Sequence, residues 1–105
     1  MKRIEVFKEN QFKDNALSTF LVHESPYMKV MNFNLKAGQS LPVHFHDIEG
    51  EVSIVVLNGS GLFLAKEGKT LPAETGDVLV CDISDPHGVQ AETDMRVLAL
   101  IAPPI

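Results

Sequence analysis

The strongest constraint on this chain is its succession of short segments in which apolar and polar residues alternate. Side chains of a β-strand point alternately to opposite faces, so this pattern is typical of half-buried strands, and no stretch has the periodicity of a convincing amphipathic helix. The segments expected to be strands are residues 3–7, 16–24, 27–36, the stretch after Pro42, 51–57, 61–66, 69–71, 78–83, 87–91 and 95–102. Eight or more strands at this spacing predict an all-β barrel or sandwich.

Residues typical of turns separate these segments and indicate how some of the predicted strands connect. Asn58-Gly59 separates residues 51–57 from 61–66 and is a strong hairpin signal, because both central positions of a type I′ turn need a positive φ. We therefore expect residues 51–57 and 61–66 to pair as a hairpin. Residues 72–77 are expected to form a loop.

The length and the net charge of the chain limit the classes of function that it can have. At 105 residues, 45% of them hydrophobic and 22% charged, the chain suits one globular domain spanning residues 1–105. A net charge of −5 without a Lys/Arg cluster disfavours nucleic acid and anionic membranes as partners. No apolar run is long enough to cross a bilayer. The single Cys81 and the lack of an apolar leader segment make a cytoplasmic location the default expectation.

Residues 38–59 hold the main chemical signal. His44 and His46 are separated by one residue, so both imidazoles share one face of an extended strand while Phe45 takes the other. If the chain reverses through residues 47–50, Glu51 returns to the same neighbourhood and adds an oxygen donor. Two imidazoles and a carboxylate suit a borderline divalent metal.

This segment resembles the first motif of the cupin superfamily. That motif is a glycine, five residues, His-x-His, three or four residues, a glutamate, six residues and a glycine. Here Gly38, His44, His46 and Glu51 follow the spacing, but Gly59 comes seven residues after Glu51 and Asn58 takes the expected glycine position. We expect the Asn58-Gly59 turn to accommodate this offset. Glu49 is a rival to Glu51 but lies too close to His46 for the motif.

The second cupin motif is matched at its ends and altered within. Gly76 and His87 have the family spacing, whereas Asp82, Ser84 and Ala91 replace the usual proline, glycine and asparagine. The resemblance covers roughly residues 27–102, leaving residues 1–26 as N-terminal strands, and implies a jelly-roll β-barrel. Carried over by position, it implies that the metal ligands are His44, His46, Glu51 and His87.

The resemblance also implies a range of activities. A divalent ion such as iron, manganese, nickel or zinc would leave coordination positions open for a small organic molecule or O₂. We expect a metalloenzyme of dioxygenase or related decarboxylase or isomerase type. The alternative is a non-enzymatic small-ligand-binding or sensing protein with a structural metal, because one fold serves both classes.

Other residues have more modest expected roles. Ser53 and Val55 are expected to lie on the same strand face as Glu51, and Val89 on the same strand face as His87. These three residues are therefore predicted to line an apolar substrate pocket. His23 lacks a partner at chelating spacing and is not expected to be a ligand, and Cys81 reads as a small buried hydrophobe. Small cupins are often dimers, and we expect a homodimer in which residues 4–6 or 97–101 pair between protomers.

Overall fold

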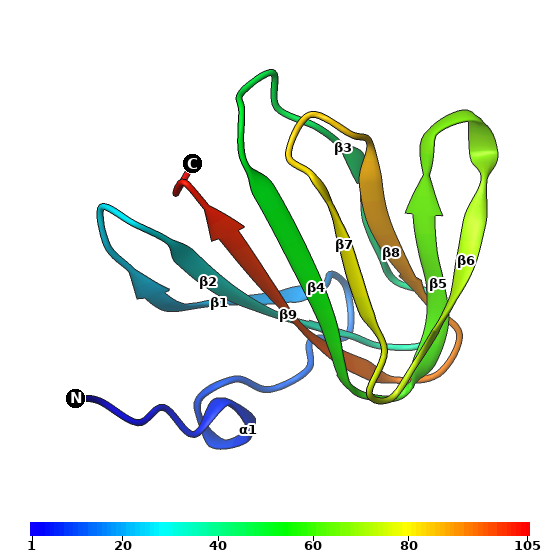
Figure 1. The fold of residues 1–105 in the computed structure, drawn as a ribbon. Helices are drawn as coiled ribbons and strands as arrows, with labels where there is room; N and C mark the ends of the chain where they lie inside the picture. The colour runs from blue at the N-terminus through cyan, green and yellow to red at the C-terminus, as the bar shows by residue number, and fades with distance from the viewer.

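The computed structural model describes residues 1–105 and contains nine strands. Figure 1 shows them as two layers that diverge toward one open end. The strands are β1 (Ser18–Glu24), β2 (Lys29–Leu35), β3 (Ser40–His44), β4 (Glu51–Asn58), β5 (Ser60–Ala65), β6 (Thr70–Glu74), β7 (Val78–Asp82), β8 (His87–Ala91) and β9 (Met95–Ala102). A short helix α1 (Val6–Glu9) and a 3₁₀ turn η1 (Lys66–Gly68) complete the elements.

The strands form two antiparallel sheets. The five-stranded sheet has the order β1-β2-β9-β4-β7, and the four-stranded sheet the order β3-β8-β5-β6. The chain crosses repeatedly from one sheet to the other, as in a jelly roll. The predicted all-β, jelly-roll fold is confirmed.

Alternation along the strands explains why the sheets pack face to face. In β4 the even positions from Val52 to Val56 are buried and the odd positions are exposed or half-buried. Strand β9 is buried at its odd positions from Met95 to Ala99. The inward rows from both sheets build one core. Its fully buried members include Leu35, Ile54, Val89 and Val97.

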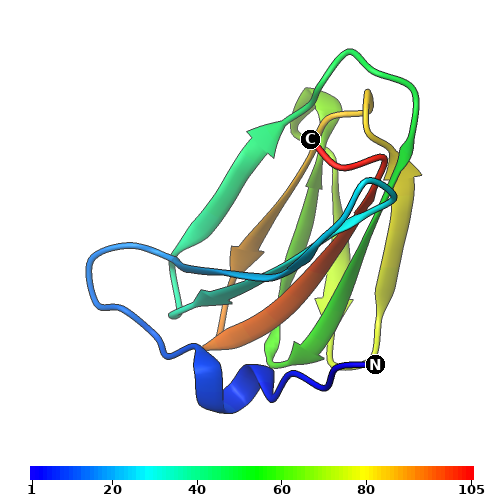
Figure 2. The same cartoon turned by 90° about the vertical axis from the view of Figure 1, so that its left-hand side faces the viewer.

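The N-terminal residues depart from the prediction. Residues 3–7 were expected to be a strand, but Val6–Glu9 form helix α1, which lies below the five-stranded sheet (Figure 2). The guanidinium of Arg96 lies 4.3 Å from the ring centre of Phe7 and 5.0 Å from that of Phe12. These contacts hold the segment beneath the sheet, and a two-residue alternation is too short to outweigh them.

The predicted hairpin at Asn58-Gly59 is also wrong. Strand β4 pairs with β7 and β9, whereas β5 pairs with β6 and β8, so the two segments lie in different sheets. Gly59 has φ +97°, but Asn58 lacks the positive φ of a type I′ turn. A Cβ at Gly59 would stand 2.3 Å from the carbonyl oxygen of Asp94. The pair therefore makes a tight corner between sheets.

Two smaller predictions need correction as well. Residues 72–77 are not all loop, because β6 runs to Glu74. Strand β9 is central in its sheet, flanked by β2 and β4, so residues 97–101 have no free edge to pair with a second protomer. Among the helices, none has the length and apolar character needed to span a membrane.

Candidate metal centre

Three of the four predicted ligands meet where the ends of β3 and β8 lie side by side. His44 and His87 are register partners across this strand pair, and their ring centres are 4.6 Å apart. His46, just beyond β3, has its ring centre 6.0 Å from that of His44. All three line one hollow of about 180 Å³, here called the histidine pocket. Its other lining residues are Lys29, Met31, Phe33, Val52, Ile83, Ile101 and Ile105.

Gly88 permits the close approach that brings His44 to His87. A Cβ at this position would lie 2.6 Å from the carbonyl oxygen of Leu41, and 2.9 Å from the backbone nitrogen of Val43. Both obstacles are backbone atoms of β3, so no side-chain rotation could relieve the contact. A glycine immediately after His87 therefore sets the spacing of the site.

Hydrogen bonds orient two of the three imidazoles. The Nδ1 of His44 lies 2.8 Å from the carbonyl oxygen of Pro42, and that of His87 lies 2.6 Å from the carbonyl oxygen of Asp85. A carbonyl only accepts, so each Nδ1 carries the proton and donates it. A neutral ring that donates through Nδ1 has an unprotonated Nε2, which is the tautomer that ligates a metal.

The three histidines differ in their exposure. His87 is 5% exposed, whereas His44 and His46 lie exposed at the mouth of the pocket. Burial lowers the pKa of His87, and the nearby His44 and His46 lower it further, against the opposing effect of its bond to Asp85. The innermost imidazole is therefore held neutral, as ligation requires.

The structure does not bring Glu51 to the histidines. Glu51 is exposed and faces outward from β4, while its neighbour Val52 is 3% exposed and lines the histidine pocket. Counting seven positions back from Gly59, as the cupin motif does, arrives at Val52 and not at Glu51. A one-residue offset in a strand moves a side chain to the opposite face, so the extra residue cannot be absorbed by the turn.

The predicted pocket residues also lie elsewhere. Ser53 and Val55 share the outward parity of Glu51, and Val89 is fully buried in the core without lining the histidine pocket. Glu49 borders a separate acidic hollow with Asp47 and Asp82.

Sequence reasoning missed the residues of β2 that line the histidine pocket, which are Lys29, Met31 and Phe33. They form one alternating row of residues 27–36, so their common face could be predicted from sequence. The strand pairing that turns this face toward the histidines could not.

The donor set fits a metal ion in its chemistry, with one adjustment of geometry. With the side chains in their present conformations, no group of three or more His, Cys, Asp or Glu residues lies close enough together to hold a metal ion. His46 makes no side-chain hydrogen bond and is exposed, so its ring is free to turn toward the other two. Three neutral imidazoles with open remaining positions are a recognised donor set for zinc and related metals.

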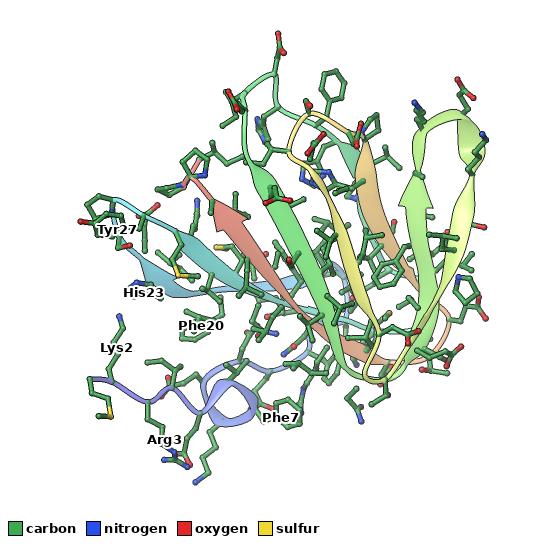
Figure 3. The ribbon with its side chains drawn as sticks, viewed as in Figure 1. Lys2, Arg3, Phe7, Phe20, His23 and Tyr27 are labelled. Carbon is green, nitrogen blue, oxygen red and sulfur yellow. The ribbon has the colours of Figure 1, made fainter.

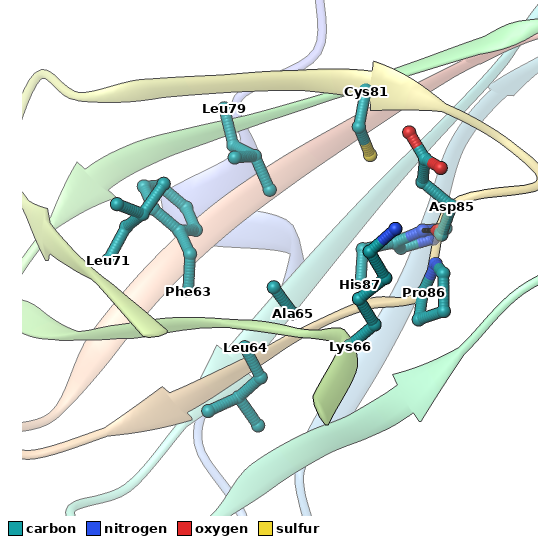
Figure 4. Close-up of a pocket in the computed structure, with 10 residues that line it drawn as sticks. All are labelled: Phe63, Leu64, Ala65, Lys66, Leu71, Leu79, Cys81, Asp85, Pro86 and His87. Atoms are coloured by element: carbon teal, nitrogen blue, oxygen red, sulfur yellow. Dashed lines mark hydrogen bonds between the residues drawn. The ribbon is translucent and has the colours of Figure 1, made fainter. Parts of the chain in front are cut away.

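A second hollow of about 200 Å³ lies on another side of His87 and shares only that residue with the histidine pocket. This Lys66 pocket is mainly apolar, with the Lys66 side chain and Asp85 at the end near His87 (Figure 4). The sulfur of Cys81 points into it. Burial, followed by Asp85 and Asp82, raises the pKa of the Cys81 thiol, which disfavours a reactive thiolate.

His23 stands apart from these sites. It lies on β1 near the tip of the β1–β2 hairpin, where Tyr27 is exposed (Figure 3). His23 does not line the histidine pocket.

Comparisons with known proteins place the chain in a family. Residues 31–102 match the family described as Cupin domain. The crystal structure of an RmlC-like cupin protein from Desulfovibrio desulfuricans is 51% identical, with a TM-score of 0.96, covering 100% of this chain and 99% of that one.

Two relatives with assigned functions match part of the chain. An oxalate-binding protein from Thermotoga maritima is 35% identical over 69 residues, covering 64% of this chain and 55% of the relative. An L-ectoine synthase from Shouchella clausii is 35% identical over 54 residues, covering 50% and 40%. The chain thus spans about half the length of these relatives or less. The family match, the double-sheet fold and the histidine motifs agree, and the chain belongs to the cupin family.

Proposed function

We propose that this chain is a small metal-binding cupin whose metal is held by His44, His46 and His87. The observation that carries the proposal is the pair of opposed imidazoles, each with Nδ1 bound to a backbone carbonyl and Nε2 left free. Because Val52 stands where the motif expects a carboxylate, the donors are all nitrogen. Imidazole suits zinc, iron and nickel, whereas manganese favours carboxylate oxygen, so we propose one of the first three ions.

A metal bound there would supply Lewis-acid or redox chemistry to a small organic molecule. The chain's own contribution is to hold the neutral imidazoles in place and to limit water with the apolar walls formed by Met31, Phe33 and Ile101. We propose an activity of dioxygenase or related decarboxylase or isomerase type. Proton transfer would fall to an imidazole or to Lys29, since no aspartate or glutamate side chain lines the histidine pocket.

A second candidate is a non-enzymatic binding or sensing protein with a structural metal. The apolar walls and the absence of acidic or hydroxyl side chains from the histidine pocket favour this candidate. The partial likeness to an oxalate-binding protein points the same way. In both cases the partner is a small molecule, and the net charge of −5 argues against nucleic acid or an anionic membrane.

We further propose a cytoplasmic homodimer. The outer face of the five-stranded sheet carries Val78 and Val80, which are 56% and 59% exposed. Val78 pairs with Val55 of the neighbouring strand β4, so the apolar surface extends to that strand, while Val80 pairs with Ser53. A second copy would cover this surface, and light scattering tests the mass in solution.

The metal proposal is tested by stripping the protein with a chelator and reloading it separately with zinc, iron(II), nickel or manganese. Elemental analysis should give about one zinc, iron or nickel ion per chain and weaker retention of manganese. Failure of all four ions to bind would refute the proposal. Turnover by the loaded forms, with and without O₂, then separates the two candidates, since binding without turnover in every form supports the second.

A further inference from the structure

The Lys66 pocket carries two opposite charges that are not paired with each other. Lys66 lies in turn η1 after β5, Asp85 lies in the turn between β7 and β8, and both line the pocket. Both are exposed, and neither takes part in an ion pair, whereas Lys29 and Lys36 each have a carboxylate partner. The pocket therefore offers a cation and an anion to a third group without any internal ion pair having to break.

The backbone of both charged residues is held by hydrogen bonds. The backbone N–H of Lys69 donates to the carbonyl oxygen of Lys66 at 3.1 Å and closes turn η1. The backbone N–H of Asp85 donates to the carbonyl oxygen of Asp82 at 3.0 Å, and the carbonyl oxygen of Asp85 accepts from His87. A ligand would have to order only the two side chains, which limits the entropy cost of binding.

The opposite end of the Lys66 pocket is apolar. Phe63, Leu71 and Leu79 gather at the end away from the two charges (Figure 4). Phe63 is 4% exposed, but Leu71 is 55% exposed. An apolar group seated among these side chains would leave water together with part of their own surface, which favours binding. The pocket thus combines an apolar end with a dipolar end.

We propose that the Lys66 pocket binds a small apolar α-amino acid in its zwitterionic form. The ligand carboxylate accepts from the Lys66 ammonium, the ligand ammonium donates to the Asp85 carboxylate, and the ligand side chain enters the apolar end. A molecule with only one of the two charges would meet one attractive and one repulsive group. A volume of about 200 Å³ favours a small ligand, because drug-sized ligands occupy pockets of about 300–1,000 Å³.

This site is separate from the metal centre. The two pockets share only His87, whose Nδ1 is already bonded to the Asp85 carbonyl oxygen. Amino-acid binding in the Lys66 pocket therefore does not require the metal. Because a free amino acid can also chelate zinc, the test has to be made on metal-free protein.

The test is an NMR titration of the chelator-treated protein near neutral pH with leucine, N-acetylleucine, leucinamide and glycine. Leucine should bind saturably, with amide shifts centred on Leu71 and Leu79. N-acetylleucine lacks the ammonium and leucinamide lacks the carboxylate, so each should bind about 3- to 10-fold more weakly. Glycine lacks the apolar side chain and should bind about 10- to 100-fold more weakly.

Variants with matched controls test the two charged residues. Lys66→Met and Asp85→Asn should each weaken leucine binding by about 3- to 10-fold. Lys69→Met and Asp82→Asn remove charges that lie close by in the sequence but do not line the pocket, and both should keep the affinity. Amide spectra verify that each variant is folded.

Four results would overturn the proposal. The first is the lack of saturable leucine binding to metal-free protein, and the second is equal affinity for leucine, N-acetylleucine and leucinamide. The third is unchanged leucine affinity in both Lys66→Met and Asp85→Asn. The fourth is a set of shifts centred on Met31 and Phe33 that develops only after zinc is added, because the amino acid would then bind in the histidine pocket.

Discussion

Gly88→Ala tests whether the close contact of β3 and β8 builds the metal centre. The added Cβ would lie 2.6 Å from the Leu41 carbonyl oxygen, whereas ordinary contact begins at 3.4 Å, so the strands must separate by about 0.8 Å (3.4 − 2.6). Overpacking of this kind costs about 1–3 kcal/mol of unfolding free energy. His44 moves with β3, and metal–ligand distances tolerate only about 0.2 Å. We expect zinc affinity to fall by about 10- to 100-fold, as when a ligand loses its supporting contacts.

Two assays separate stability from geometry in this variant. Urea unfolding of the metal-free protein gives the loss of stability, and competition with a chromogenic chelator gives the zinc affinity. Gly61→Ala is the matched control, because its Cβ would lie 2.1 Å from the Gln90 carbonyl oxygen on the β5–β8 side, away from the histidines. It should destabilise the fold and keep the zinc affinity. Equal zinc affinity in Gly88→Ala and the unaltered protein would refute the reasoning.

Three further results are expected. Val52→Glu would place a carboxylate in the histidine pocket, and should raise manganese affinity at least about tenfold in competition titrations, equivalent to ~1.4 kcal/mol; an unchanged affinity would contradict the inward placement of Val52. Since the folded-state pKa of His87 lies below the unfolded value of about 6.5, the metal-free protein should lose unfolding free energy as pH falls below that value. The loss should stop once pH passes the folded-state pKa, and urea unfolding of His87→Gln should show a flatter profile. Val80→Lys should convert the dimer to monomer in light scattering, and an unchanged mass would exclude this face as the interface.

Much of the fold could be predicted from local pattern alone. Alternation of apolar and polar residues identifies β2, β4, β7, β8 and β9 nearly to their ends, because each has one face in a shared core. The predictions from local pattern fail where contacts between distant parts of the chain determine the structure. Residues 3–7 alternate like a strand, yet the rings of Phe7 and Phe12 pack around Arg96 from the opposite end of the chain.

Turn chemistry was a weaker guide than strand pattern. Asn58-Gly59 satisfies the rule for a tight hairpin, but the sheets of a jelly roll require the chain to leave one layer and enter the other at this point. Gly59 is needed for its positive φ and for its close approach to Asp94, and Asn58 adopts an ordinary conformation. A local signal cannot distinguish these two uses of one glycine.

The spacing of motif residues in the sequence predicted part of the candidate metal site. The histidine pair and His87 could be located from the spacing of their motifs, although His46 lies beyond the end of β3 and does not share a strand face with His44. Glu51 could not, since its role depended on the phase of β4, which the core sets through Val52, Ile54 and Val56. The position of Lys29 in the wall of the histidine pocket could not be predicted from sequence, because it depends on which strands lie beside β2.

The identity of the side chains that hold the metal can be measured directly. Elemental analysis should compare zinc content in the unaltered protein, in Glu51→Gln, and in three variants that each replace one histidine of the centre by glutamine. We predict full zinc content in Glu51→Gln and loss of most of the zinc in the variants of His44, His46 and His87. Loss of zinc in Glu51→Gln, or its full retention in His87→Gln, would contradict a centre built from three imidazoles.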